Sequence, residues 1–232
     1  QAFQTNDRTF KQSDAGDYSS GGFGHYVQFL TVQPYLLNVR FGKWSEILRS
    51  KKPVSQNTAH KIYWHFGQGM AQAKTKKIAA AKKSLAAMKE LMKENSLDAR
   101  MGLRSRTIDI MQVPVNILQG TIALQERKKN DAIQFLTATV AAEDTIHYAE
   151  PERWRIPARH YLAQAYLDLH MPDKAKTILE EDLKDHPGNF WAINGLKEAL
   201  NERFELPERQ ELLKRYKQVF DLADIKLKGS AY

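Results

Sequence analysis

IPARHYLAQAYLDLHMPDKAKTILEEDLKDHPG, residues 156–188, is the stretch that decides the fold class of this chain. Its apolar residues recur at spacings of three and four, which is the pattern of one buried helix face. Pro172 separates two such faces and Pro187 follows the second, at positions where helices begin and end. The stretch therefore predicts two antiparallel helices joined by a short turn.

The same helical spacing continues along the chain from Tyr26, and strand signals are almost absent. A short helix is expected between Gly42 and Pro53. Pro114 is expected near the start of a later helix, where its missing N–H does no harm. The other helices expected before residue 156 are 58–74, 78–94, one ending near 127, and 131–144. The predicted class is all-α.

An internal repeat links these helices. Three blocks share a small residue, an alanine twelve positions later and a leucine four positions after that: Gly69–Ala81–Leu85, Gly120–Ala132–Leu136 and Ala163–Ala175–Leu179. Small residues are needed where the two helices of a hairpin approach closely. The successive alanines are 51 and 43 residues apart. The repeat thus predicts an array of antiparallel helical hairpins with irregular junctions.

The block 156–188 resembles the tetratricopeptide repeat, a helix–turn–helix unit. Further segments are similar to a largely uncharacterised group of bacterial proteins with such repeats: Val39–Trp44, Trp64–Ala71, Glu143–Trp154, Glu181–Asn189 and Phe220–Ile225. The resemblance covers about residues 35–227. It implies an α–α superhelix and a non-catalytic scaffold for protein–protein interaction, in the bacterial cytoplasm or periplasm.

The domain organisation follows from these segments. Residues 1–24 are polar and glycine-rich and are expected to form a flexible lead or linker. Residues 25–232 are expected to form a single repeat domain with units at about 28–53, 57–95, 106–144, 155–188 and 189–225. Because the first residue is Gln1, the chain is interpreted as a processed or excised piece. An array cut in this way could expose an apolar flank and self-associate.

In such an array the first helix of each pair lines the concave face, and a protein or peptide partner lies along it. When the repeat blocks are aligned on one another, the corresponding positions of the first helices predict the lining of this groove. The predicted lining residues are Tyr63, Phe66, Met70, His160, Tyr161, Gln164 and Trp191. No lysine or arginine occurs in this set, so the carboxylate clamp of the chaperone-binding members is not expected. The competing interpretation is that these residues pack neighbouring hairpins together.

A cluster of histidines and acids between residues 143 and 160 offers an alternative function, a metal-binding or enzymatic module. His147 and Glu150 are three positions apart and could ligate a metal if the stretch were helical. The stretch is expected to be a loop between helices, and a solvated acidic loop is the simpler interpretation. No cofactor is expected, because no nucleotide-binding or hydrolase motif is present in the sequence.

Charge and composition limit the partner class. The net charge of +8 suits an acidic partner, and the chain contains no cysteine. Seven lysines between residues 74 and 93 accompany an amphipathic helix and are expected on its solvated face. Specific nucleic-acid binding is not expected, because arginines and interleaved stacking aromatics are missing there. No apolar run is long enough for a transmembrane segment.

Overall fold

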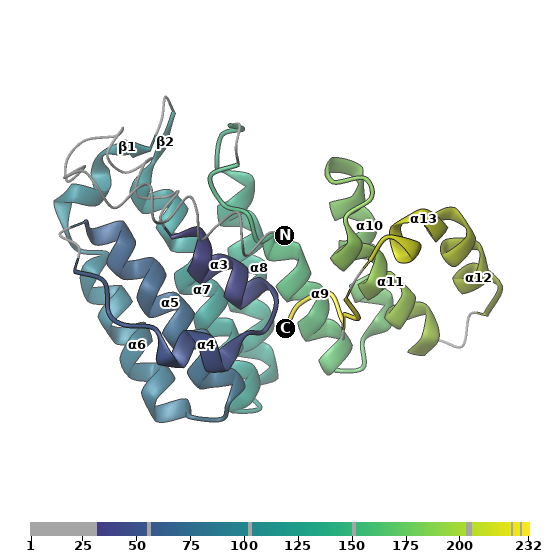
Figure 1. Ribbon diagram of the computed structural model, residues 1–232, viewed down its shortest axis with the longest axis horizontal. Helices are drawn as coiled ribbons and strands as arrows, with labels where there is room; N and C mark the ends of the chain where they lie inside the picture. The colour runs from purple at the N-terminus through teal and green to yellow at the C-terminus, as the bar shows by residue number, and fades with distance from the viewer. Residues whose placement is uncertain are drawn as a thin grey trace. The chain divides into compact units, whose positions relative to one another are not determined.

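The computed structural model describes residues 32–54, 57–101, 104–149, 152–202, 206–223, 225–227 and 229–232. These residues form eleven α-helices, one 3-10 helix and two strands of two residues each (Figure 1). The all-α prediction is confirmed, with packed helix pairs as the building block. The predicted lead at 1–24 lies outside the described residues. The chain divides into two compact units, Gln1–Ile156 and Pro157–Tyr232.

The first unit contains three helix pairs. Their helices are α3 (Gln33–Arg40), α4 (Trp44–Arg49), α5 (Thr58–Lys74), α6 (Ile78–Leu91), α7 (Thr107–Gln125) and α8 (Lys129–Asp144). Helix α5 packs against its partner α6 and also against α3 and α7, the first helices of the neighbouring pairs. A 3-10 turn at Asn95–Asp98 and the antiparallel strands β1 (Arg100–Met101) and β2 (Ser105–Arg106) join α6 to α7.

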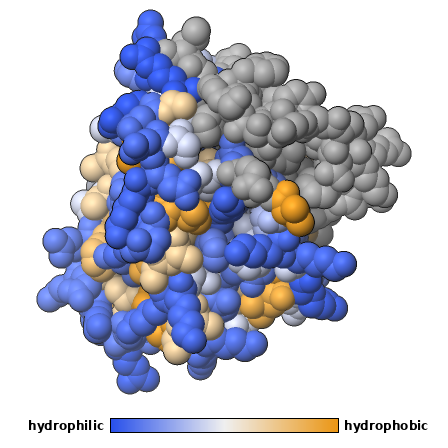
Figure 2. Space-filling model, turned by 90° about the vertical axis from the view of Figure 1, so that its left-hand side faces the viewer, coloured by the Kyte–Doolittle hydropathy of each residue, from blue (hydrophilic) through white to orange (hydrophobic). Residues whose placement is uncertain are grey.

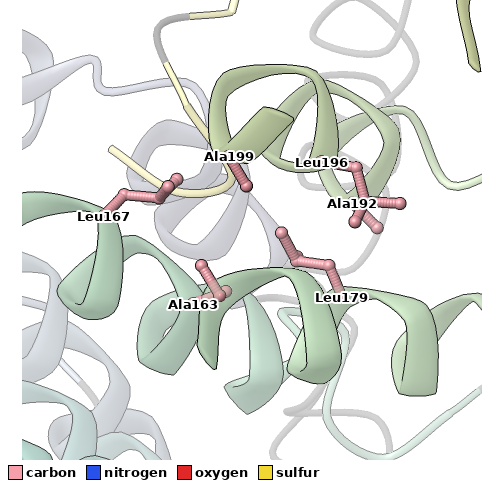
Figure 3. Close-up of a cluster of buried hydrophobic side chains, with 7 residues drawn as sticks. Ala163, Leu167, Leu179, Ala192, Leu196 and Ala199 are labelled. Atoms are coloured by element: carbon pink, nitrogen blue, oxygen red, sulfur yellow. The ribbon is translucent and has the colours of Figure 1, made fainter. Parts of the chain in front are cut away.

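The second unit contains α9 (Ala158–Asp168), α10 (Pro172–Asp185), α11 (Phe190–Glu202), α12 (Leu206–Arg215) and α13 (Lys217–Asp221). Helix α10 packs between α9 and α11, and these two first helices also contact each other. Small residues alternate with leucines in their shared core, which Figure 3 shows: Ala163, Leu167, Ala175, Leu179, Ala192, Leu196 and Ala199. The alanines bring the three helices close, and the leucines fill the space that remains.

One turn geometry recurs in four helix pairs. A residue with positive φ stands at the same place in each: Gly42, Lys76, Arg127 and His170. The residue after it donates its backbone N–H five positions back, as Lys77 does to Gln72 at 2.8 Å and Met171 does to Tyr166 at 2.8 Å. This is the Schellman ending of a helix. In three pairs the turn residue lies seven positions after the small residue of the repeat, so the sequence repeat corresponds to a repeated local structure.

The small residues of the repeat do permit close approach, although to different neighbours. A Cβ added to Gly120 would lie 2.6 Å from Cγ of Leu136, on the second helix of the same pair. A Cβ added to Gly69 would overlap Leu118, on the first helix of the next pair. The same repeat position therefore serves packing within a pair at α7 and packing between pairs at α5.

The predicted position of Pro114 was wrong. It lies inside α7, seven residues after Thr107, and not near the start of the helix. A proline there removes the hydrogen bond that the carbonyl of Ile110 would otherwise accept. Twelve residues of α7 are buried, and Pro114 is one of them. The packing of α7 against its neighbours therefore maintains the helix through the proline.

Candidate functional site

In the second unit a short chain segment, residues 229–231, is held between α9 and α11 by side-chain amides. Gln164 on α9 accepts through Oε1 from the backbone N–H of Ser230 at 2.8 Å and of Ala231 at 3.4 Å. Asn194 on α11 donates from Nδ2 to the carbonyl of Gly229 at 3.1 Å. All three hydrogen bonds are made to main-chain atoms of the segment. We call the group formed by Gln164, Asn194, Gly195 and the carbonyl of His160 the amide site.

The segment fits the amide site closely. The hydroxyl of Ser230 donates to the carbonyl of His160 at 2.9 Å, and Ser230 is fully buried. A Cβ added to Gly229 would overlap the side-chain amide of Gln164. A Cβ added to Gly195 would lie 2.7 Å from Cβ of Ser230. A Cβ at Gly229 would thus displace the carboxamide of Gln164, and a Cβ at Gly195 would displace Ser230.

Two charged side chains orient the amides of this site. Asp168 accepts from Nε2 of Gln164 at 2.9 Å, which leaves Oε1 to face the segment. Lys197 donates to Oδ1 of Asn194 at 2.8 Å, which leaves Nδ2 to face Gly229. Because an amide offers an acceptor at one end and donors at the other, these partners determine which end meets the segment. The amide site is preorganised for one pattern of backbone donors and acceptors.

A buried carboxylate lies behind this site. Asp182 on α10 is 1% exposed and meets Nε2 of His160 at 2.8 Å and Nδ1 of His186 at 3.2 Å. Burial raises the pKa of Asp182, but hydrogen bonds and positive charge from His160 and His186 outweigh burial, so the net pKa is lowered. The pair of His160 and Asp182 joins α9 to α10 beneath the segment. It holds the carbonyl of His160 where Ser230 reaches it.

The groove residues predicted on α5 are buried in the first unit. Tyr63 is 1% exposed, and Phe66 and Met70 are not exposed. The ring of Trp154 stacks on Tyr63 at 6.2 Å between centroids and meets Phe66 edge-on at 5.7 Å. Trp154 comes from the chain that follows α8. These α5 rings therefore contact a segment of their own unit.

The predicted residues of the second unit have different environments. Gln164 is half-buried and belongs to the amide site, to which His160 contributes its carbonyl. Tyr161 is buried, and Trp191 is half-buried at the start of α11, where its backbone N–H donates to Asn189. Asn194, which donates to the carbonyl of Gly229, was not among the predicted groove residues. It lies three positions after Trp191, on the same face of α11, and this spacing was the signal that could have found it.

The alternative cluster around His147 is described only in part. His147 follows α8, and its backbone N–H donates to Oγ of Ser105 at 3.1 Å. Glu150 lies outside the described residues. Among the residues that the structure describes, no three His, Asp or Glu side chains are arranged to hold a metal ion.

The lysines near α6 lie on the solvated side of the helix, as predicted. Lys82, Lys83 and Lys89 are exposed, whereas Ala81 and Met88 of the same helix are buried. The face of the molecule in Figure 2 is largely hydrophilic, with apolar side chains in small groups. Glu126 pairs with Lys82 and with Lys128, so part of this positive charge is neutralised. In the described ranges, no helix has the length and apolar character that a membrane span requires.

No protein-family model, curated protein or solved structure matches this chain. The resemblance to tetratricopeptide repeats therefore stays a prediction from the sequence. Function has to be argued from the geometry of the amide site and from the helix pairs that build it.

Proposed function

We propose that this chain is a non-catalytic scaffold for protein–protein interaction that binds a segment of a partner against the first helices of its hairpins. The proposal includes the α–α superhelical, tetratricopeptide-like arrangement that the sequence resemblance implies. It is supported by the repeated helix pairs with a common turn geometry. It is supported further by the amide site, where α9 and α11 already hold a chain segment.

The observation that carries the proposal is recognition of a main chain by Gln164 and Asn194. Backbone N–H and C=O groups are present in every polypeptide, and they need partners when they are buried. A site that supplies one acceptor for two consecutive N–H groups and a donor for one carbonyl is therefore suited to a peptide that bends as residues 229–231 do. In peptide recognition generally, main-chain hydrogen bonds supply affinity, and pockets for side chains supply specificity.

The test is selection from a random peptide library displayed against the full chain. The bait carries Gly229→Val, because a side chain at this position overlaps Gln164 and forces the 229–231 segment out of the amide site. A matched bait carries Asn194→Leu in addition, which keeps the size of the side chain and removes the amide. We expect peptides to be enriched on the first bait and lost on the second, with equal helix content by circular dichroism.

Either of two results would reject the proposal. One is a library from which no peptide is enriched above an empty support. The other is enrichment of the same peptides on both baits, which would place their binding away from the amide site. The metal-binding alternative would then have to be examined by metal analysis of untagged protein and its His147→Ala variant.

A further inference from the structure

We infer that residues 229–231 are an internal ligand of the amide site, and that the partner segment replacing them carries a glycine followed by a small residue. The inference rests on the proposed function, which it extends by naming the chemistry of the partner. It follows from the contacts that Gly229 and Ser230 make in the amide site. The partner is thus expected to be a polypeptide segment that bends at a Gly–Ser or Gly–Ala step, and it competes with residues 229–231.

The first position of the bound segment selects glycine. Gly229 has no side chain, and a Cβ added to its Cα would overlap the carboxamide of Gln164. That carboxamide cannot swing aside without cost, because Asp168 holds its Nε2 and the N–H groups of Ser230 and Ala231 hold its Oε1. A partner with any other residue here loses these hydrogen bonds or cannot enter.

The second position selects a small residue, and serine best. Cβ of Ser230 sits against Gly195 of α11, and its hydroxyl finds an acceptor in the carbonyl of His160. With the side chain fully buried, a larger residue has no free volume to occupy. The following residues, Ala231 and Tyr232, are only half-buried, so selection relaxes after the second position.

The segment can leave without dismantling the second unit. The cluster from Ala163 to Ala199 is formed by side chains of α9, α10 and α11 alone. Leu227 is also buried, but it precedes the segment and need not leave with it. Figure 3 shows this core with the yellow C-terminal segment crossing the view beside it. The segment is tethered to α13, so it competes with an external peptide at the high effective concentration typical of a linked ligand.

The experiment uses a fluorescent peptide of residues 225–232 and fluorescence anisotropy. Three full-length proteins are compared: wild type, Gly229→Val, and Gly229→Val with Asn194→Leu. A peptide that itself carries Gly229→Val is the matched control ligand. We expect the wild-type peptide to bind the Gly229→Val protein at least about tenfold more tightly than wild type, because the internal competitor is displaced. The double variant and the control peptide should show no binding.

A second measurement avoids dependence on the folding of any variant. Saturating peptide added to the wild-type chain should displace the internal segment, so the amide of Ser230 should lose its protection against hydrogen exchange. Retained protection at every peptide concentration overturns the inference.

Failure of this inference is distinguishable from failure of the proposed function. Library peptides that require Asn194 but lack the Gly–small step would leave the interaction function in place and overturn the inference. Equal binding of the wild-type and control peptides would do the same. If no library peptide and no 225–232 peptide binds through the amide site, both proposals are rejected.

Discussion

At the scale of single residues, the buried histidine of α5 gives the chain a defined response to acid. His60 is 8% exposed and lies near the start of the helix, with its ring 5.9 Å from that of Tyr35. Burial lowers the pKa of His60 to about 4, because a low-dielectric environment disfavours the charged imidazolium. In the unfolded chain the ring returns to its ordinary value of 6.5.

This difference in pKa sets the direction of the pH dependence. Between pH 6.5 and about 4 the unfolded chain binds a proton on His60 and the folded chain does not, so folding stability falls as the pH falls. From about pH 7 to about pH 5 the expected loss from His60 is about 2 kcal/mol. His60→Leu should remove this part of the loss. Urea unfolding at both pH values, followed by tryptophan fluorescence, measures it.

The control for this prediction is His147→Leu, since His147 is exposed. It should leave the pH dependence of the wild type unchanged. A wild-type chain with the same stability at both pH values would contradict the prediction, as would an equal effect of the two substitutions.

At the scale of helices, two interior glycines are expected to respond in opposite ways to a methyl group. A Cβ on Gly67 of α5 would meet Ile47 and Tyr35 at ordinary contact distances of 3.7 and 3.8 Å. A Cβ on Gly120 of α7 would lie 2.6 Å from Cγ of Leu136, which is itself 1% exposed. Gly67→Ala should stabilise the first unit by about 0.5–1 kcal/mol, because alanine is the better helix former.

Gly120→Ala gains the same helix propensity but forces Leu136 out of its packed position. Overpacking of this kind costs about 1–3 kcal/mol, so the net effect should be a destabilisation of about 1–2 kcal/mol. Urea denaturation of both variants beside wild type, followed by circular dichroism, gives the two changes in unfolding free energy. Stabilisation of both variants would show that α7 approaches α8 less closely than the distance at Gly120 indicates, and destabilisation of both would contradict the prediction for Gly67.

Most of the helices could be predicted because their signals are local. Helix α5 begins and ends at the predicted residues, since apolar periodicity and breakers report burial and chain reversal directly. Pro114 misled because α7 is held by its neighbours, which a single helix does not reveal. The recurring turn geometry at Lys76 and Arg127 could not be predicted, since neither lysine nor arginine favours a positive φ.

The candidate site was harder to predict because its two sides are far apart in the chain. Ser230 contacts Gln164 across 66 positions, and the segment that carries Ser230 has no helical periodicity to mark it. The contacts of the predicted groove residues on α5 were hidden for a similar reason: Trp154, which contacts Tyr63 and Phe66, comes from a loop. The sequence identifies which helix faces are apolar, but not which loop covers them.

At the scale of the whole molecule, the net charge of +8 and the amide site point to different kinds of partner. Positive charge attracts nucleic acid or an anionic surface, and such binding weakens steeply with salt because counterions are released. The hydrogen bonds of the amide site to the segment come from carboxamides, a carbonyl and backbone groups, none of which is charged. Salt therefore separates the two modes of binding.

We expect the affinity of the 225–232 peptide for the Gly229→Val protein to stay within about twofold between about 50 and about 200 mM salt, whereas a phosphate-dependent ligand that makes several contacts loses orders of magnitude. A single-stranded oligonucleotide titrated under the same conditions provides the comparison. Its binding, if detected, should collapse over this range and should be unaffected by Asn194→Leu. Peptide binding that falls as steeply as oligonucleotide binding would mean that the lysines, and not the carboxamides of Gln164 and Asn194, provide the affinity.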